Sequence, residues 1–394
     1  MTDTGRRAEA SYDAIVLGVG GMGAAACYHL ARRGRRVLGL ERFDIPHSMG
    51  SSHGVTRIIR LAYYEHPSYV PLLRRAYDLW RELETLTGEH LLHQVGSIDA
   101  GAETDLVFAG SLASCITHDL AHDVLSGADL RRLYPGYRLP SDYFALFQPD
   151  GGFLEPERCI IAHVLTAQAA GAEIHARERV LGWEPAGDGV RVTTDHGTYN
   201  AARLVVSAGA WIDHFVPDLV GLARPERQVL AWFQPDQPAL FTPERFPVFN
   251  LAVPEGRYYG FPVWGVPGFK IGRYGHRGET VDPERFQREP DEADEALLRE
   301  ATARYFPAAA GPTMALRTCL FTVTPDEHFV IGPLPGVPQV IVASPCSGHG
   351  FKFCSVVGEI LTDLVDTGET AHDIGLFGFE RLATLPQPRT GVAA

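Results

Sequence analysis

The run YDAIVLGVGGMGAAACYHLARRGRRVLGLE at residues 12–41 decides the fold of this chain. It begins with a short and mostly apolar segment, 12–17, that is typical of a buried parallel strand. A glycine-rich turn follows, and then an alanine-rich helical pattern that ends at Gly34. Residues 37–40 form a second short apolar segment. The order strand, helix, strand therefore predicts a βαβ unit.

The glycine-rich turn carries the GxGxxG pattern, with Glu41 placed 23 residues beyond Gly18. Between a strand and a helix this pattern is typical of dinucleotide binding, because the glycines let the backbone approach a pyrophosphate at the positive end of the helix. Glu41 is expected to bind the adenosine ribose. The presence of Arg42 next to it can be explained without NADP as the cofactor. The alternative is a turn that binds nothing. We predict cofactor contacts from Gly18, Gly20, Gly21, Met22, Gly23, Glu41 and Arg42.

Length and composition limit the classes of protein to which this chain can belong. A chain of 394 residues predicts two domains, and 45% hydrophobic with 21% charged residues is ordinary for a globular protein. The net charge of −13 argues against a nucleic acid or an anionic membrane as partner. No run approaches the roughly 18 apolar residues of a membrane span, and the polar residues 1–11 lack a signal-peptide core. The six cysteines form no C-x-x-C pair, so we expect a cytoplasmic protein without a metal site.

The other end of the chain repeats the pattern of strand, glycine turn and helix. A strand at 340–343 leads into the turn SPCSGHG at 344–350, and 351–365 shows a helical pattern. A strand with small residues at its end is expected at 201–211, where close approach of a cofactor and a simple tight turn are equally good explanations. If both glycine turns contact one cofactor, the binding domain is discontinuous. Further helices are expected at 67–87 and, from its charges, at 282–299.

Four further segments resemble the family of monomeric sarcosine oxidase, N-methyltryptophan oxidase and pipecolate oxidase. They are GSSHGVTRIIR at 50–60, YYGFP with GFKIG within 258–272, TC with TPDE within 318–327, and SGHGFK at 347–352. They stand in the same order as in that family and cover nearly the whole chain.

The resemblance implies an α/β fold like that of D-amino-acid oxidase. It implies a discontinuous Rossmann-like FAD-binding domain and a second, substrate domain with a mainly antiparallel sheet. We assign residues 1–90, 150–220 and 320–394 to the first domain and residues 91–149 and 221–319 to the second.

Cys319 is the residue that the resemblance assigns to covalent flavin attachment, through its sulfur to the 8α carbon of the ring. A covalent bond is expected to raise the reduction potential of the flavin and to prevent its loss. The alternative is a buried structural cysteine, which is the usual state of a free cysteine.

Lys270 is the lysine that the resemblance places over the flavin, where its charge would stabilise developing superoxide. The alternative is a surface lysine whose stem covers apolar neighbours. Tyr259 is expected beside the substrate, with Tyr258 as the competing assignment.

A third group of residues is expected to bind substrate and flavin. The resemblance implies that Arg60 and Lys352 bind the substrate carboxylate, Arg60 through a forked pair of hydrogen bonds. Arg57 and His53 are expected near the flavin ring as catalytic groups. On a helix, Arg57 and Arg60 would share a face, and a solvated basic face is the alternative. Further expected cofactor contacts are Ser51, Ser52, His53, Thr56, Arg57, Val180, Ala208, Gly209, Trp211, Gly348, His349, Gly350, Phe351 and Lys352; for His349, a loop residue satisfied by backbone is equally expected.

Two departures from the family pattern concern the substrate. Pro345 and Cys346 stand where the family usually has Gly-Phe, and Tyr274 stands where sarcosine-type enzymes carry a histidine, with His276 the nearest histidine. We expect Tyr274 and Cys346 to contact the substrate. A bulkier, cyclic or biosynthetic amino acid is therefore at least as plausible as sarcosine.

The sequence thus predicts a monomeric FAD-dependent oxidase of a secondary-amine amino acid, N-methyl or cyclic, that forms an imine and hydrogen peroxide. Its expected partners are this small-molecule substrate and oxygen. The alternatives are a flavin dehydrogenase that uses another electron acceptor, a biosynthetic oxidase of an unusual cyclic amino acid, and a non-catalytic flavoprotein.

Overall fold

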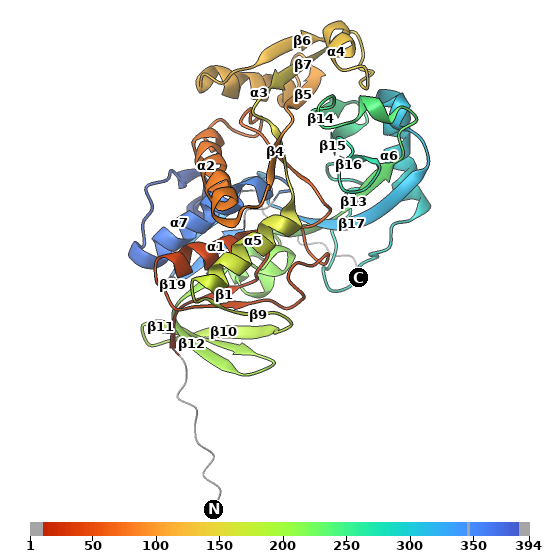
Figure 1. Cartoon of the computed structure of the whole chain (residues 1–394). Coiled ribbons are helices and arrows are strands. Elements are labelled where there is room, and N and C mark those ends of the chain that lie inside the picture. The colour runs from red at the N-terminus through yellow and green to blue at the C-terminus, as the bar shows by residue number, and fades with distance from the viewer. Residues whose placement is uncertain (1–10, 345–346, 386–394) are drawn as a thin grey trace, which may run out of the picture. The chain divides into compact units, whose positions relative to one another are not determined.

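The computed structural model describes residues 11–344 and 347–385, and these form two compact units (Figure 1). Unit 1 comprises Met1–Ser52, Glu157–Pro225 and Phe321–Ala394, and unit 2 comprises His53–Pro156 and Glu226–Leu320. Unit 1 is therefore assembled from three separate stretches of sequence. Residues 53–90 and 150–156, which we expected in the FAD-binding domain, group with unit 2, and the strand at 57–59 pairs there with the strand at 152–154.

Unit 1 contains an eight-stranded sheet around the predicted βαβ unit. The strand order is β10-β11-β12-β1-β2-β9, and β19 pairs with β12 while β18 pairs with β19. The pairs β1–β2, β1–β12, β2–β9 and β12–β19 are parallel. The strands are β1 (Ser11–Leu17), β2 (Val37–Leu40), β9 (Glu173–His175), β10 (Val180–Ala186), β11 (Gly189–Thr194), β12 (Thr198–Val206), β18 (Val330–Leu334) and β19 (Val337–Ser344).

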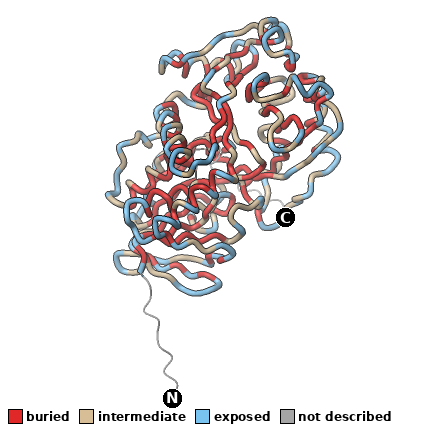
Figure 2. The backbone as a smooth tube through the Cα atoms, in the orientation of Figure 1, coloured by how far each residue is buried: buried red, intermediate tan, exposed pale blue. Residues whose placement is uncertain are grey.

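Three helices belong to this sheet: α1 (Gly21–Arg32), α5 (Pro156–Ala169) and α7 (Cys354–Thr367). Helices α1 and α7 touch closely, because a Cβ on Gly358 would lie 2.6 Å from the backbone of Ala25. The central strands β1 and β2 are mostly buried, whereas β11 alternates between buried and less buried residues and β10 is largely exposed or half-buried (Figure 2). This contrast is expected for parallel strands covered on both faces.

The structure confirms the α/β class and the βαβ unit at the N-terminus. The strand expected at 201–211 ends at Val206, and Gly209–His214 is a 3-10 helix η1. The helix expected from residue 351 begins with the 3-10 turn η5 (Phe351–Phe353) and continues as α7. Shorter 3-10 segments are η2 (Pro217–Leu219), η6 (Gly375–Phe377) and η7 (Phe379–Thr384).

Unit 2 contains a second eight-stranded sheet in the order β17-β13-β16-β15-β14-β5-β7-β6. Neighbours from β13 to β14 and from β5 to β6 are antiparallel, and β14–β5 is parallel, so the sheet is mainly antiparallel as expected. The strands are β5 (Ser97–Ala102), β6 (Asp123–Ser126), β7 (Tyr143–Gln148), β13 (Arg224–Phe233), β14 (Val248–Val253), β15 (Gly256–Phe261), β16 (Phe269–Arg273) and β17 (Thr313–Val323).

One face of this sheet forms an aromatic core. Phe249, Phe269 and Phe306 pack together there with Leu298 and Tyr305 of helix α6 (Glu292–Tyr305). The remaining elements of unit 2 are α2 (Tyr69–Thr87), α3 (Leu106–Thr117), α4 (Gly127–Leu133), η3 (Pro238–Leu240), η4 (Pro307–Ala309) and a small sheet of β3 (Arg57–Ile59), β8 (Gly152–Leu154) and β4 (Leu92–Gln94). Side chains on the opposite face of the large sheet do not belong to this aromatic core.

Among the described residues, the helices are too short or too polar to cross a membrane.

Candidate active site

The glycine turn of unit 1 opens helix α1 without a capping side chain. Gly20 is the N-cap residue, and as a glycine it has no side chain that could cap the first turn. Gly18 has a φ of +87°, and a Cβ on Gly23 would lie 1.8 Å from the carbonyl oxygen of Gly18. Only glycine permits this close approach of the backbone. Met22 and its neighbours therefore lie at a helix N-terminus that can bind a phosphate.

Glu41 is held at the end of β2, as predicted. Its carboxylate is buried and accepts hydrogen bonds from the backbone N–H of Val19 (2.9 Å) and of Phe43 (2.9 Å). The two bonds fix the carboxylate beside the glycine turn with acceptor capacity to spare, since a carboxylate can accept about four. Arg42 lies over the ring of Trp211, 5.8 Å from its centroid. This arrangement fits an adenine dinucleotide such as FAD.

Segments from other parts of unit 1 meet the glycine turn. Ser52 accepts a hydrogen bond from the N–H of Gly21 at 3.4 Å, and a Cβ on Gly21 would lie 2.9 Å from the ring of Phe351. The structure thus brings the N-terminal turn, the serine pair Ser51–Ser52 and the C-terminal motif together. Val180 begins β10, and Ala208 and Gly209 follow β12.

The C-terminal motif is a tight loop with its side chains bound to backbone. Gly348 has a φ of +76°, and its Cβ position would collide with Phe321 at 2.4 Å. His349 makes a ring-nitrogen hydrogen bond to the carbonyl of Glu327 (2.9 Å), which is the backbone-satisfied state that we considered. Gly350 precedes the turn η5, where the buried Lys352 donates to the carbonyl of His349 (2.8 Å). Pro345 and Cys346 lie outside the described residues.

Lys270 lies on β16 in unit 2 and is buried, not a surface residue. Its ammonium group is 1% exposed and donates to the carbonyl oxygens of Gly54 (2.7 Å) and Thr56 (2.8 Å) and to the Thr56 hydroxyl (2.9 Å). Nζ also lies 4.3 Å from the ring centroid of Phe261. Three oxygen acceptors match the three N–H donors of an ammonium group, so the charge is held in a fixed position.

Cys319 lies close to the same segment. Arg57 donates to its sulfur at 3.4 Å, and the side chain of Cys319 is buried. Burial raises the pKa of the Cys319 thiol, while the charges of Arg57 and Lys270 act in the opposite direction. A cysteine beside a guanidinium is a better nucleophile than a cysteine in an apolar core, because the positive charge stabilises the thiolate.

Strand alternation places Tyr259 on the face of the sheet that carries Lys270. Tyr259 pairs with Gly272, and Phe261 pairs with Lys270, so these side chains share a face. A Cβ on Gly272 would lie 2.6 Å from the Tyr259 ring, so the glycine makes room for the ring. Burial raises the pKa of the Tyr259 hydroxyl. Tyr258 points to the opposite face and belongs to the aromatic core, which favours Tyr259 in the predicted role.

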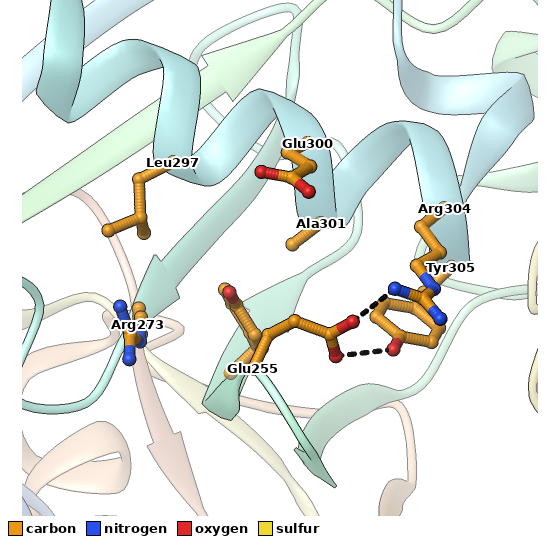
Figure 3. Close-up of a pocket in the computed structure, with 8 residues that line it drawn as sticks. Glu255, Arg273, Leu297, Glu300, Ala301, Arg304 and Tyr305 are labelled. Carbon is orange, nitrogen blue, oxygen red and sulfur yellow. Dashed lines mark hydrogen bonds and ion pairs between the residues drawn. The ribbon is translucent and has the colours of Figure 1, made fainter.

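The opposite face of the sheet carries a pocket of about 270 Å³ (Figure 3). Glu255 lies at one side of it, where its carboxylate pairs with Arg304 and accepts a hydrogen bond from Tyr305 (2.7 Å). Arg273 and Tyr258, which are paired across β16 and β15, also line it. Because these residues alternate with Gly272 and Tyr259, the pocket is separate from the face that holds Lys270.

Arg60 is buried in an ion-pair cluster that the sequence did not reveal. One guanidinium nitrogen bonds both oxygens of Glu65 (3.0 and 2.8 Å), and another lies 3.8 Å from Asp99 and bonds the carbonyl of Ala62. Burial opposes the charged form, but the two carboxylates raise the pKa of Arg60 above its usual value. No sequence motif marks Glu65, because its link to Arg60 depends on the local fold.

Arg57 and Arg60 do not lie on a helix. Arg57 lies in strand β3 and Arg60 directly follows that strand, so the argument from a shared helical face was wrong. His53 is buried two residues before the left-handed Val55.

Tyr274 follows β16, with Arg257 stacked on its ring 3.9 Å from the centroid. His276 is not a displaced equivalent of the family histidine. It is fully buried and makes a ring-nitrogen hydrogen bond to Asp294 (2.9 Å), which also binds Arg227. This histidine is therefore engaged in joining helix α6 to the sheet.

Comparisons with known proteins agree with this geometry. A family model described as FAD dependent oxidoreductase matches residues 13–364. Monomeric sarcosine oxidase from Streptomyces avermitilis is 43% identical over 95% of this chain and 99% of its own length. N-methyl-L-tryptophan oxidase from Yersinia pestis is 34% identical over 94% and 99%, respectively. These relatives confirm the resemblance inferred from the motifs.

Solved structures show the same fold over nearly the whole chain. NikD, described as an unusual amino acid oxidase essential for nikkomycin biosynthesis, has a TM-score of 0.81 at 28% identity and covers 98% of this chain and 99% of its own. L-proline dehydrogenase from P. horikoshii has a TM-score of 0.82 at 19% identity, over 96% and 99% of the two chains, and this likeness concerns the fold alone. With its glycine turn, the buried carboxylate of Glu41 and the family match in agreement, the chain belongs to the FAD dependent oxidoreductase family.

Proposed function

We propose that this protein is an FAD-dependent oxidase of a secondary-amine amino acid, N-methyl or cyclic, that yields an imine and hydrogen peroxide. The observation that carries the proposal is the buried ammonium group of Lys270, fixed by Gly54 and Thr56 next to the Arg57–Cys319 pair. The identity of 43% to a monomeric sarcosine oxidase supports the same class of reaction.

FAD, when bound, would accept a hydride equivalent, which is two electrons and one proton, from the substrate. The residues of this chain that would hold it are the glycine turn and Glu41 in unit 1. We further propose that it is attached covalently through Cys319, with the neighbouring guanidinium of Arg57 stabilising the thiolate that forms the bond. Acid denaturation tests this step, because a covalently attached flavin stays with the precipitated chain.

The substrate carboxylate is proposed to bind Arg60 and Lys352. A guanidinium group offers a carboxylate two parallel hydrogen bonds, and Lys352 is a buried cation. In this structure Glu65 occupies the guanidinium of Arg60, so an incoming carboxylate must share or replace that contact. The two cations are expected to favour substrates with a free, ionised carboxylate over simple amines, and the competition from Glu65 is expected to weaken the binding of that carboxylate.

The amine is proposed to react in its neutral form, with Tyr259 beside it and Lys270 providing positive charge for the reaction with oxygen. A fixed charge in a site with little water stabilises a developing anion without having to reorganise at the moment of reaction. His53 and Arg57 are the remaining proposed catalytic groups.

An anaerobic screen of substrates tests the proposed function. The purified holoenzyme is mixed without oxygen with sarcosine, other N-methyl amino acids, proline and pipecolate, and bleaching of the flavin absorbance is recorded. We expect bleaching with at least one of these amino acids and an equimolar yield of peroxide when oxygen is admitted. Bleaching without peroxide would instead indicate a dehydrogenase, and no bleaching by any amino acid would contradict the proposal.

A biosynthetic oxidase of an unusual cyclic amino acid is the second candidate. It is favoured by the likeness to NikD and by Tyr274, which stands where sarcosine-type enzymes carry a histidine. A monomeric state and a cytoplasmic location are also proposals, which gel filtration and cell fractionation would test.

A further inference from the structure

The pocket of about 270 Å³ that helix α6 and strands β15 and β16 line has no role in the proposed reaction. Its residues belong to unit 2, and its strand residues lie on the face of the sheet opposite to Lys270. A water molecule takes about 30 Å³ in the liquid, so the pocket has room for a molecule of about nine non-hydrogen atoms. This is the size of a small amino acid.

Arg273 brings a positive charge to this pocket. In the part of the chain that the structure describes, its guanidinium group makes no hydrogen bond or ion pair. The group lies against the backbone of Gly256, because a Cβ at that glycine would lie 2.6 Å from Nε and 3.2 Å from a terminal nitrogen. Gly256 has a φ of +137°, which favours glycine, so the residue that makes this turn also leaves room for the guanidinium. The half-buried Arg273 therefore lines the pocket with its charge unpaired.

Two carboxylates line the same pocket. Glu255 pairs with Arg304 and accepts a hydrogen bond from the hydroxyl of Tyr305 (2.7 Å), and these contacts hold it in place. Glu300 on α6 is exposed and makes no hydrogen bond or ion pair with any described residue. Figure 3 shows Arg273 at one end of the pocket and Arg304 at the other, with the two carboxylates between them. The pocket thus offers an unpaired cation and an unpaired carboxylate to a ligand.

The hydroxyl group of Tyr258, which also lines the pocket, is affected by all three charges. Burial raises the pKa of this hydroxyl, the charge of Arg273 acts in the opposite direction, and the charges of Glu255 and Glu300 raise it further. Because both signs of charge act on one hydroxyl, the cation and the carboxylates lie close enough together to bind the two ends of one small molecule.

We propose that this pocket binds a free α-amino acid as a zwitterion, with its carboxylate on Arg273 and its ammonium group on Glu300 and Glu255. A guanidinium and a carboxylate form charge-assisted hydrogen bonds, which are stronger than neutral ones. The side chain of the amino acid would pack against Leu297 and Ala301, so an apolar side chain of a few carbons fits best. The proposal goes beyond the oxidase function, because the pocket is separate from the flavin site and binding there requires no electron transfer.

L-Valine is the probe, because its size fits the pocket and its amine is primary, whereas the proposed oxidase substrate has a secondary amine. Two analogues keep its shape and remove one charge each: 3-methylbutanoate lacks the amine, and isobutylamine lacks the carboxylate. Titration calorimetry of the holoenzyme measures binding, and the flavin absorbance is recorded in parallel. We expect L-valine to bind, and each analogue to bind about tenfold more weakly, because it loses the hydrogen bonds of one charged group.

Arg273→Gln and Glu300→Gln should each weaken the binding of L-valine about tenfold. Their melting temperatures should stay the same, because neither side chain has a partner among the described residues. Glu292→Gln is the control: it removes an exposed carboxylate of the same helix outside the pocket, and its binding of L-valine should be normal.

The proposal is overturned if L-valine gives no heat of binding, if either analogue binds as tightly, or if either pocket variant binds L-valine normally. Binding that shifts the flavin absorbance and is unchanged in the pocket variants would place L-valine in the flavin site instead. None of these outcomes depends on whether an amino acid reduces the flavin, so the proposal can fail while the proposed oxidase function stands.

Discussion

Replacing Lys270 with methionine removes a buried charge while keeping a long, unbranched side chain. In the structure the ammonium group makes hydrogen bonds of 2.7, 2.8 and 2.9 Å to Gly54 and Thr56 and is 1% exposed. The variant therefore loses the positive charge and leaves three oxygens without their donor. The loss of the charge is expected to affect flavin reoxidation, and the loss of the donor is expected to affect the backbone at Gly54 and Thr56.

The loss of charge should slow the reaction with oxygen. A unit charge about 4 Å from a developing anion contributes roughly 4 kcal/mol at an effective dielectric constant of 20. Removal of a preorganised electrostatic group in other enzymes slows catalysis by about 10²–10³-fold, or roughly 3–4 kcal/mol. Both estimates predict that reoxidation of the reduced flavin slows by about 10²–10³-fold in Lys270→Met. Flavin reduction should change only a few-fold, because the charge that the flavin gains in that step is spread over its ring system.

Stopped-flow spectroscopy separates the two half-reactions. Flavin bleaching by an amino acid that reduces the holoenzyme in the anaerobic screen is recorded without oxygen, and the reduced enzyme is then mixed with oxygenated buffer. Lys270→Gln serves as the control, because it keeps N–H donors and loses the charge; its reoxidation should be slow as well. Equal slowing of both half-reactions in Lys270→Met would refute this reasoning, as would a Lys270→Gln variant that reoxidises at the normal rate.

Three further outcomes are expected. Cys319→Ser should release its flavin on acid precipitation, whereas the unchanged protein should retain it; release from both would exclude a covalent bond at Cys319. Glu65→Gln should bind acetate about five- to tenfold more tightly in a flavin-difference titration, because the carboxylate that competes for Arg60 is gone; unchanged affinity would place the ligand elsewhere. Burial lowers the pKa of His29 to about 4 and that of His163 to about 3, below the ordinary 6.5. The unfolded chain therefore binds more protons below pH 6.5, and stability should be lost as the pH falls toward 4, by about 3 kcal/mol for His29 alone. Urea unfolding at pH 7 and pH 4.5 measures this loss of stability. A His29→Leu variant that loses as much stability between these two pH values as the unchanged protein would contradict the assignment.

The βαβ unit and its cofactor role could be predicted from the sequence because their determinants are local. The glycines at 18, 20 and 23, the buried strands and Glu41 all lie within 30 residues, and the backbone geometry that they require is specific to glycine. The sheet of unit 2 offered no such signal. Its central pair, β14 and β5, joins residues about 150 positions apart, and strand patterns alone do not specify such partners.

The candidate site, too, could be predicted only in part from the sequence. Lys270 and Cys319 could be assigned by resemblance, but the groups that surround them became visible only in the fold. The role of Glu65 depends on how the chain turns after Arg60, so no sequence pattern could have indicated it.

One short turn connects Lys270 with Cys319. Val55 has a φ of +72°, and the N–H of Thr56 bonds the carbonyl of Gly54 at 2.8 Å, which together describe a γ-turn with a β-branched residue at its centre. Such a backbone costs about 1–3 kcal/mol and persists only where its surroundings hold it. Lys270 bonds the carbonyls of Gly54 and Thr56, on the two sides of Val55, so its ammonium group stabilises the turn, and Arg57 next in the chain reaches Cys319. The same ammonium that is proposed to favour reaction with oxygen therefore also orients the guanidinium proposed to activate the cysteine. Because Lys270→Gln keeps N–H donors for the turn and Lys270→Met does not, flavin attachment should be slower in the methionine variant even though both lose the charge.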